Sequence, residues 1–147
     1  MRSEKKPTGH GQALVEFALV IGLIVLILVG IFDLGRIVYT TAALSNAARE
    51  GARVAAVTGD TNKINAAIIS TGIGLNIQSG QIGAPVYCLS ADCSSTTGNR
   101  STTGVVAVKI SISNYPFTAI TPLIGRIFGP SDTINLSTSA SMTMEKP

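Results

Sequence analysis

The hydrophobic residues of this chain are concentrated in one uninterrupted run near the N-terminus. Residues 17–32 (FALVIGLIVLILVGIF) contain no charged or strongly polar side chain, and extension back through Glu16 to Ala13 gives 20 residues. A helix of that length measures about 30 Å, the thickness of the hydrocarbon core of a bilayer. The pattern therefore predicts one membrane-spanning helix, with Glu16 near one edge of the membrane.

The residues that follow the apolar run continue the helical pattern. Residues 33–60 are rich in alanine and contain no proline, and Gly59-Asp60 predicts a stop. One helix over 12–57 would be about 65–70 Å long, which greatly exceeds the thickness of the membrane. Its outer half must therefore pack on another part of the protein or on another subunit. Apolar residues keep helical spacing, with steps of three and four within 38–42 and within 48–56: Val38, Ala42, Ala48, Ala52, Ala55 and Ala56. This face suits close packing on the protein's own C-terminal domain or on other subunits, and the sequence favours neither.

From residue 60 the pattern changes. Asp60 or Thr61 is placed to cap a short helix that carries Ile64, Ala67 and Ile68 on one face. Residues 70–104 are dominated by glycine, serine and threonine, and they end in a polar loop without periodicity.

Two later segments alternate between apolar and polar residues, from Val106 to Ile112 and from Ile134 to Met144. Such alternation predicts antiparallel strands with one buried face. Residues 117–130 are expected to form a short amphipathic helix or a hydrophobic connector between them. The strand at 131–145 is either a solvated edge, which its serines and threonines favour, or an edge offered to another subunit.

These elements predict an α+β fold in which a long N-terminal transmembrane helix continues into a small antiparallel β-sheet domain. We divide the chain into a cytoplasmic basic leader (1–11), a transmembrane and extended N-terminal helix (12–57) and an extracytoplasmic α+β domain (58–147).

Charges near the apolar run predict its orientation. The leader contains Arg2, Glu4, Lys5 and Lys6. A short basic flank of this kind normally stays in the cytoplasm, and only Arg36 and Arg49 oppose it from the other side. The C-terminal domain is therefore expected outside the cytoplasmic membrane. A cleaved secretory signal fits poorly, because Ile31-Phe32 stands where a signal peptidase needs small residues.

The remaining composition argues against nucleic-acid binding and catalysis. The net charge is +3, basic residues are scattered, and there is no tryptophan. The single histidine, His10, lies in the leader, and no nucleophile or phosphate-binding motif occurs. We expect no enzyme, no catalytic residue, no cofactor, no metal and no nucleic-acid partner.

Two cysteines, Cys88 and Cys93, stand in a polar loop. Their C-x4-C spacing is wide for a redox pair, and no second pair or nearby histidine completes a zinc site. A local disulfide is the favoured interpretation if this half of the chain is exported, and two free thiols are the alternative.

A glycine-to-glutamate spacing marks the entrance to the apolar run. Glu16 stands fifth after Gly11, which resembles a prepilin processing site, where a peptidase on the cytoplasmic face cuts after the glycine. Cleavage would leave Gln12 as the N-terminus, one helical turn from the Glu16 carboxylate. The new ammonium group is a natural partner for a carboxylate inside the membrane, on the same chain or on a neighbour. The alternative is an interfacial glutamate that reaches water.

The stretch GQALVEFALV, the apolar run and DLGRIVYTTAALSNAAREGARVAAV together resemble the TadE-like family, which comprises minor pilins or pseudopilins of tight-adherence (Tad/Flp) pilus systems. The family usually has a proline in the apolar run, where this chain has Gly22, so we infer no proline kink. The alternating segment LSTSASMTME near the C-terminus is also TadE-like. The resemblance implies a pilin-like fold, an assembly role for Glu16 and Phe17, and a helix interaction motif formed by Gly35, Arg36, Asn46, Arg49, Glu50, Gly51 and Arg53.

Two functions from different classes follow. The first is a minor pilin, processed at Gly11–Gln12, whose partners would be the membrane, other pilins or pseudopilins, the pilus assembly platform and a prepilin peptidase. The second is an unprocessed, single-span anchored module for extracytoplasmic binding or adhesion. Both are expected in the cytoplasmic membrane, and the first is also expected in association with a pilus.

Overall fold

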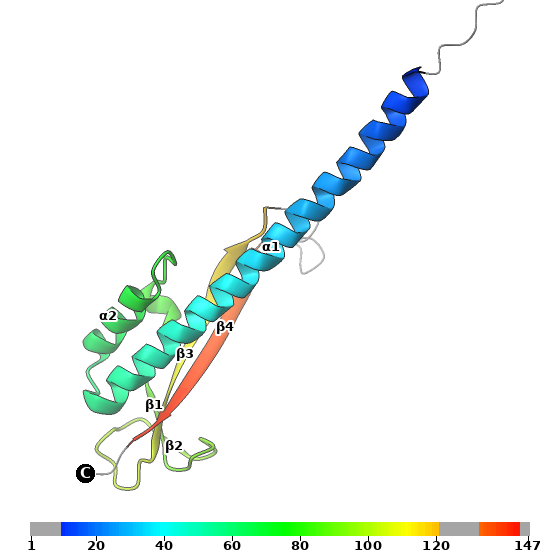
Figure 1. Cartoon of the computed structure of the whole chain (residues 1–147). Helices are drawn as coiled ribbons and strands as arrows, with labels where there is room; N and C mark the ends of the chain where they lie inside the picture. The colour runs from blue at the N-terminus through cyan, green and yellow to red at the C-terminus, as the bar shows by residue number, and fades with distance from the viewer. Residues whose placement is uncertain (1–9, 121–132, 145–147) are drawn as a thin grey trace, which may run out of the picture.

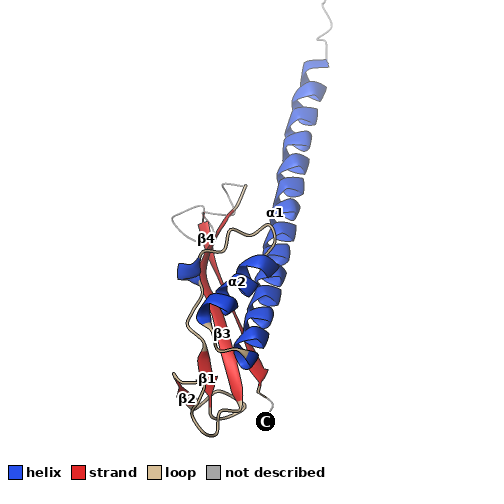
Figure 2. Cartoon of the chain, turned by 90° about the vertical axis from the view of Figure 1, so that its left-hand side faces the viewer, coloured by secondary structure: helices blue, strands red, loops and turns tan. Residues whose placement is uncertain are grey.

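One long helix dominates the molecule and extends far beyond the rest of the chain (Figure 1). The computed structural model describes residues 10–120 and 133–144. Helix α1 runs from His10 to Val57 without interruption, 48 residues or about 72 Å. Its N-terminal half stands alone, whereas its C-terminal half lies against the other helix and the sheet (Figures 1 and 2). The predicted long helix and its end at Val57 are confirmed.

The end of α1 is defined by local chemistry. Gly59 has a φ of +66°, a left-handed conformation that glycine adopts without cost, and it turns the chain back toward α1. The Arg100 guanidinium donates to the carbonyls of Ala56 and Val57 over 3.0 and 2.9 Å, satisfying acceptors that a helix end leaves open.

Helix α2 (Thr61–Thr71) begins immediately after this turn. The Asp60 side chain accepts a hydrogen bond of 2.9 Å from the backbone N–H of Asn62, which makes Asp60 the N-cap. Ile64 and Ile68 are buried against α1. The predicted short helix is therefore confirmed, and of the two predicted capping residues, Asp60 and Thr61, Asp60 is the cap.

The sheet has four antiparallel strands in the order β2-β1-β3-β4. Their bounds are Val86–Cys88 for β1, Thr96–Thr97 for β2, Ala107–Thr118 for β3 and Thr133–Thr143 for β4, and a short 3-10 helix, η1, covers Ser79–Gln81. The long pair β3 and β4 lies along α1 (Figure 2). Strand β4 is an edge strand, and its half-buried residues alternate with exposed ones from Thr133 to Ala140. The predicted α+β architecture and both predicted strands are confirmed.

Strand β3 is longer than predicted. The predicted alternation ended at Ile112, because a bulge after that residue changes the face to which the residues point. The register with β4 shifts between Ile112 and Tyr115, and Asn114 takes a left-handed φ of 57°. Before the bulge Ile110 and Ile112 are buried, and after it Phe117 is buried, so the inward positions change from even to odd. The expectation that residues 117 and 118 belong to a connector was wrong, because they continue β3. Residues 121–130 of that connector lie outside the described residues.

The core lies between the C-terminal half of α1, helix α2 and the inner face of the sheet. Its buried members are Leu44, Ala47, Ala48, Ala52, Ala55, Ile64, Ile68, Ile77, Tyr87, Val108, Ile110 and Ile112. Two small residues assigned from the sequence to the packing face, Val38 and Ala42, are exposed. The packed stripe follows Leu44, Ala48 and Ala55 instead, because the sheet and α2 cover only that side of the helix.

Candidate assembly site along the N-terminal helix

The entrance to the apolar run lies in the first two turns of α1. Gly11, Gln12, Glu16 and Phe17 are all exposed, and Phe17 keeps 66% of its surface. Gln12 and Glu16 are four residues apart on one helix, so they share a face. Within residues 10–120 and 133–144, the Glu16 carboxylate makes no hydrogen bond or ion pair. A carboxylate so placed is open to a partner outside the described contacts.

The apolar run has nothing packed against it. Every residue from 11 to 28 is exposed around the whole circumference of the helix. Leu14, Leu19, Leu23 and Leu28 keep 60–72% of their surface. In the described part of the chain, α1 is the one helix long and apolar enough to cross a membrane. Apolar surface on this scale needs cover from lipid or from other helices, so α1 is compatible with membrane anchoring.

The predicted helix interaction motif divides between two faces of α1. Gly51 is buried, and it lets α2 approach so closely that a Cβ added there would lie 2.5 Å from Cγ1 of Ile68. Asn46, Arg49 and Arg53 are exposed on the opposite side. Gly51 therefore serves the protein's own fold, while Asn46, Arg49 and Arg53 face outward.

On the outward face, Arg53 forms a bidentate ion pair with Glu50. The guanidinium donates from Nε and Nη2 at 2.9 and 2.7 Å. These hydrogen bonds hold the pKa of Glu50 below its usual value, so the pair persists as the pH falls below neutrality. Arg49 makes no such pair within the described residues, and its side chain is exposed.

A junction between α1 and the end of β3 lies one turn beyond the apolar run. Asp33 is fully buried, and its Oδ1 accepts a hydrogen bond of 3.1 Å from the Ile120 backbone N–H. Arg36 donates from Nη1 to the Thr118 carbonyl at 3.4 Å and to Asp33 at 3.5 Å. The guanidinium carbon lies 5.1 Å from the centre of the Phe117 ring, a cation–π distance. These contacts fix the sheet on α1.

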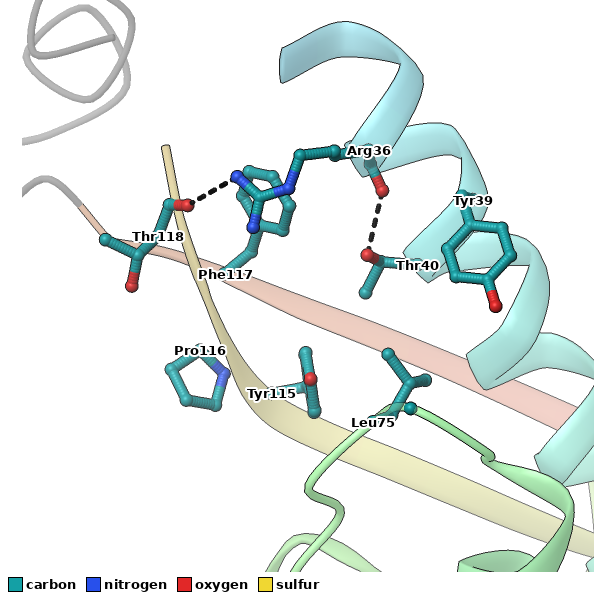
Figure 3. Close-up of a pocket in the computed structure, with 9 residues that line it drawn as sticks. Arg36, Tyr39, Thr40, Leu75, Tyr115, Pro116, Phe117 and Thr118 are labelled. Carbon is teal, nitrogen blue, oxygen red and sulfur yellow. Dashed lines mark hydrogen bonds between the residues drawn. The ribbon is translucent and has the colours of Figure 1, made fainter. Parts of the chain in front are cut away.

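An open groove of about 330 Å³ adjoins this junction. Its walls come from α1, from residues 74–75 after α2, and from the last four residues of strand β3 (115–118). Figure 3 shows this arrangement. The lining residues are Arg36, Tyr39, Thr40, Gly74, Leu75, Tyr115, Pro116, Phe117 and Thr118. Of the predicted motif, the groove contains only Arg36, whereas Gly35 is exposed nearby on α1.

Sequence reasoning missed Asp33 and the aromatic residues of β3 at this junction. Asp33 immediately follows the apolar run and precedes Arg36 by three residues, a spacing at which helical side chains meet. The Asp33–Arg36 spacing could therefore have indicated an ion pair at this junction. The Phe117 contact had no such signal, because it depends on the bulge in β3.

Cys88 and Cys93 are joined by a disulfide, with their Cα atoms 4.8 Å apart. Cys88 ends β1 and is fully buried, and Cys93 has a positive φ of 54°. The turn between them is closed by a hydrogen bond of 3.1 Å from the Cys93 N–H to the Ser90 carbonyl. The pair lies at the end of the sheet far from the apolar half of α1 (Figure 1).

We predict that this disulfide forms in cells if the domain beyond Val57 is exported, because disulfides persist in oxidising compartments. Because Cys88 is buried, alkylation should be carried out on protein denatured without reductant, so that burial does not mimic a bond. We expect labelling of neither thiol before reduction and of both after it. Two labelled thiols in denatured, unreduced protein would contradict the prediction.

Among the described residues, no group of three His, Cys, Asp or Glu side chains lies close enough to hold a metal ion. The arrangement instead offers surfaces: an uncovered apolar helix, a carboxylate near its start, and cations on its outer face. These surfaces suit association with a membrane and with other proteins.

Comparison with curated proteins and with solved structures found no match. Comparison with family models found one, described as TadE-like protein, over residues 11–53. The match covers the entrance, the apolar run and the motif up to Arg53, and it stops before α2. The predicted resemblance is confirmed: residues 11–53 of this chain are a TadE-like segment.

Proposed function

We propose that this chain is a minor pilin-like component in the assembly of a tight-adherence pilus. The single observation that carries the proposal is the uncovered apolar half of α1 within the TadE-like segment. TadE-like proteins are pilus components, and a helix of this kind suits both storage in a membrane and packing in an assembly. In this proposal the domain beyond Val57 is held outside the cytoplasmic membrane.

The proposal includes processing. A prepilin peptidase at the cytoplasmic face would cut between Gly11 and Gln12, and the new ammonium group would pair with Glu16 of the same or a neighbouring subunit. Other pilins or pseudopilins and the assembly platform are the proposed partners. The exposed Asn46, Arg49 and Arg53 supply polar contacts for them.

The mature N-terminus tests this proposal against an unprocessed anchored module. We expect intact-mass and peptide mass spectrometry of protein from a host with an active prepilin peptidase to find Gln12 first. Gly11→Val should block the cut, because a peptidase that accepts glycine at the bond has no room for a branched side chain. Protein that retains residues 1–11 in such a host would favour the anchored module.

A further inference from the structure

We propose that the groove beside Arg36 binds the phosphate headgroup of a phospholipid in the outer leaflet. The inference rests on the proposed membrane anchoring by α1. It assigns a ligand to the groove defined above, which the pilin-like function does not use.

The position of the groove along α1 supports a headgroup ligand. Arg36 follows Phe32, the last residue of the uninterrupted apolar run, by four residues, which is about 6 Å along the helix. The polar layer of a bilayer extends about 5–7 Å beyond the hydrocarbon core on each side. A helix that spans the core up to Phe32 therefore places Arg36 at the depth of the phosphates, and it places the backbone of Tyr39, about 10 Å from Phe32, just outside the polar layer.

The Arg36 guanidinium has an open edge. Both of its hydrogen bonds within the described residues come from Nη1, and the side chain is 40% exposed. The N–H groups of Nε and Nη2 remain, and they form a planar fork that matches two phosphate oxygens. Phe117 and the Thr118 carbonyl hold the guanidinium from the other side, so the fork is preorganised (Figure 3).

The other groove walls suit an amphipathic ligand. Tyr39, Tyr115, Pro116 and Leu75 provide aromatic and apolar surface, and tyrosine is a side chain that favours the membrane interface. Of the described residues that line the groove, Arg36 is the one with a charge. The neighbouring Asp33 carboxylate is fully buried and turned to Arg36 and Ile120, so it does not present a negative charge to the open side.

The absence of tryptophan from the sequence allows a clean test with the full chain in lipid nanodiscs. A Tyr39→Trp variant reports from the groove, and a Leu89→Trp variant reports from the distal end near the disulfide. Phosphatidylglycerol with a nitroxide on its headgroup is titrated into the discs, and quenching is measured. We expect strong, saturable quenching of the Tyr39→Trp reporter and little of the Leu89→Trp reporter.

Two substitutions at Leu75 distinguish binding of the headgroup from mere proximity of the groove to the membrane. Leu75→Glu puts a carboxylate into the groove without touching the Arg36–Asp33 pair, and Leu75→Gln is its neutral match. With the Tyr39→Trp reporter, we expect Leu75→Glu to raise the lipid fraction for half-quenching about tenfold, the loss of one charge-assisted contact, and Leu75→Gln to change it little. Arg36→Lys, which keeps the charge and loses the fork, should fall between wild type and Leu75→Glu.

Three results of the quenching titration would overturn the inference. The first is equal quenching at both reporters, and the second is equal behaviour of Leu75→Glu and Leu75→Gln. The third is relief of quenching by excess inorganic phosphate, which would make the groove a free-anion site. A chain that fails to enter nanodiscs would overturn both the membrane anchor and this inference, whereas a chain that enters but shows no selective quenching would overturn this inference alone.

Discussion

Replacing Gly51 with valine is expected to destabilise the packed half of the protein by about 1–3 kcal/mol, the usual cost of overpacking a core. Any Cβ at this position would lie 2.5 Å from Cγ1 and 2.6 Å from Cδ1 of Ile68. Ile68 is itself fully buried, so it cannot move aside without disturbing its neighbours. Denaturant unfolding of the detergent-solubilised protein, followed by circular dichroism, measures the change.

Gly35 provides the matched control. It lies on the same helix, and a Cβ added there meets nothing within 4 Å. Gly35→Val should leave stability unchanged or raise it slightly, because valine is the better helix former. Equal unfolding midpoints for Gly51→Val and Gly35→Val would show that α2 does not pack on Gly51 as described.

A double-mutant cycle makes the same point more sharply. Ile68→Ala removes the two atoms that a Cβ at Gly51 would meet, at a cost of about 2–5 kcal/mol from the cavity. Gly51→Ala should be less harmful in that background than alone, with a coupling energy of about 0.5–3 kcal/mol. Strict additivity of the two substitutions would contradict direct contact.

Glu16→Gln is expected to abolish association with pilus partners while leaving the protein in the membrane. The change keeps the size of the side chain and removes the charge that would pair with the ammonium group of a processed Gln12. A pair in a region of low dielectric matters more than one at a wet surface, and between subunits it would set their axial register. Crosslinking and co-purification from membranes, with protein level measured in parallel, give the result.

Asp92→Asn is the control for Glu16→Gln. It removes a carboxylate from the exposed distal turn, where Asp92 Oδ1 accepts from the Ser94 hydroxyl at 3.0 Å. It should leave partner association intact. If Glu16→Gln and Asp92→Asn both retain their partners at wild-type levels, Glu16 is only an interfacial residue.

The local pattern of the sequence was sufficient for α1, α2, β4 and the first part of β3. Helical spacing, the Asp60 cap and the alternation from Ile134 onward are each signals of one local conformation. The short strands β1 and β2 have no such signal, because three and two residues show no periodicity and exist by pairing with neighbours.

The face of α1 that packs inward was predicted only in part. Alanine spacing alone cannot distinguish Ala42, which is exposed, from Ala48, which is buried, since both are small and apolar. The choice is made by where the sheet lies. The contacts that hold the sheet on α1, such as the Asp33–Ile120 hydrogen bond, join residues far apart in the sequence.

The proposed role in pilus assembly is tested by counting surface pili by electron microscopy in a piliated host from which this chain has been deleted. We predict that deletion removes most or all pili, that the wild-type chain restores them, and that Glu16→Gln at equal protein level does not. Undiminished piliation in the deletion strain would contradict the account.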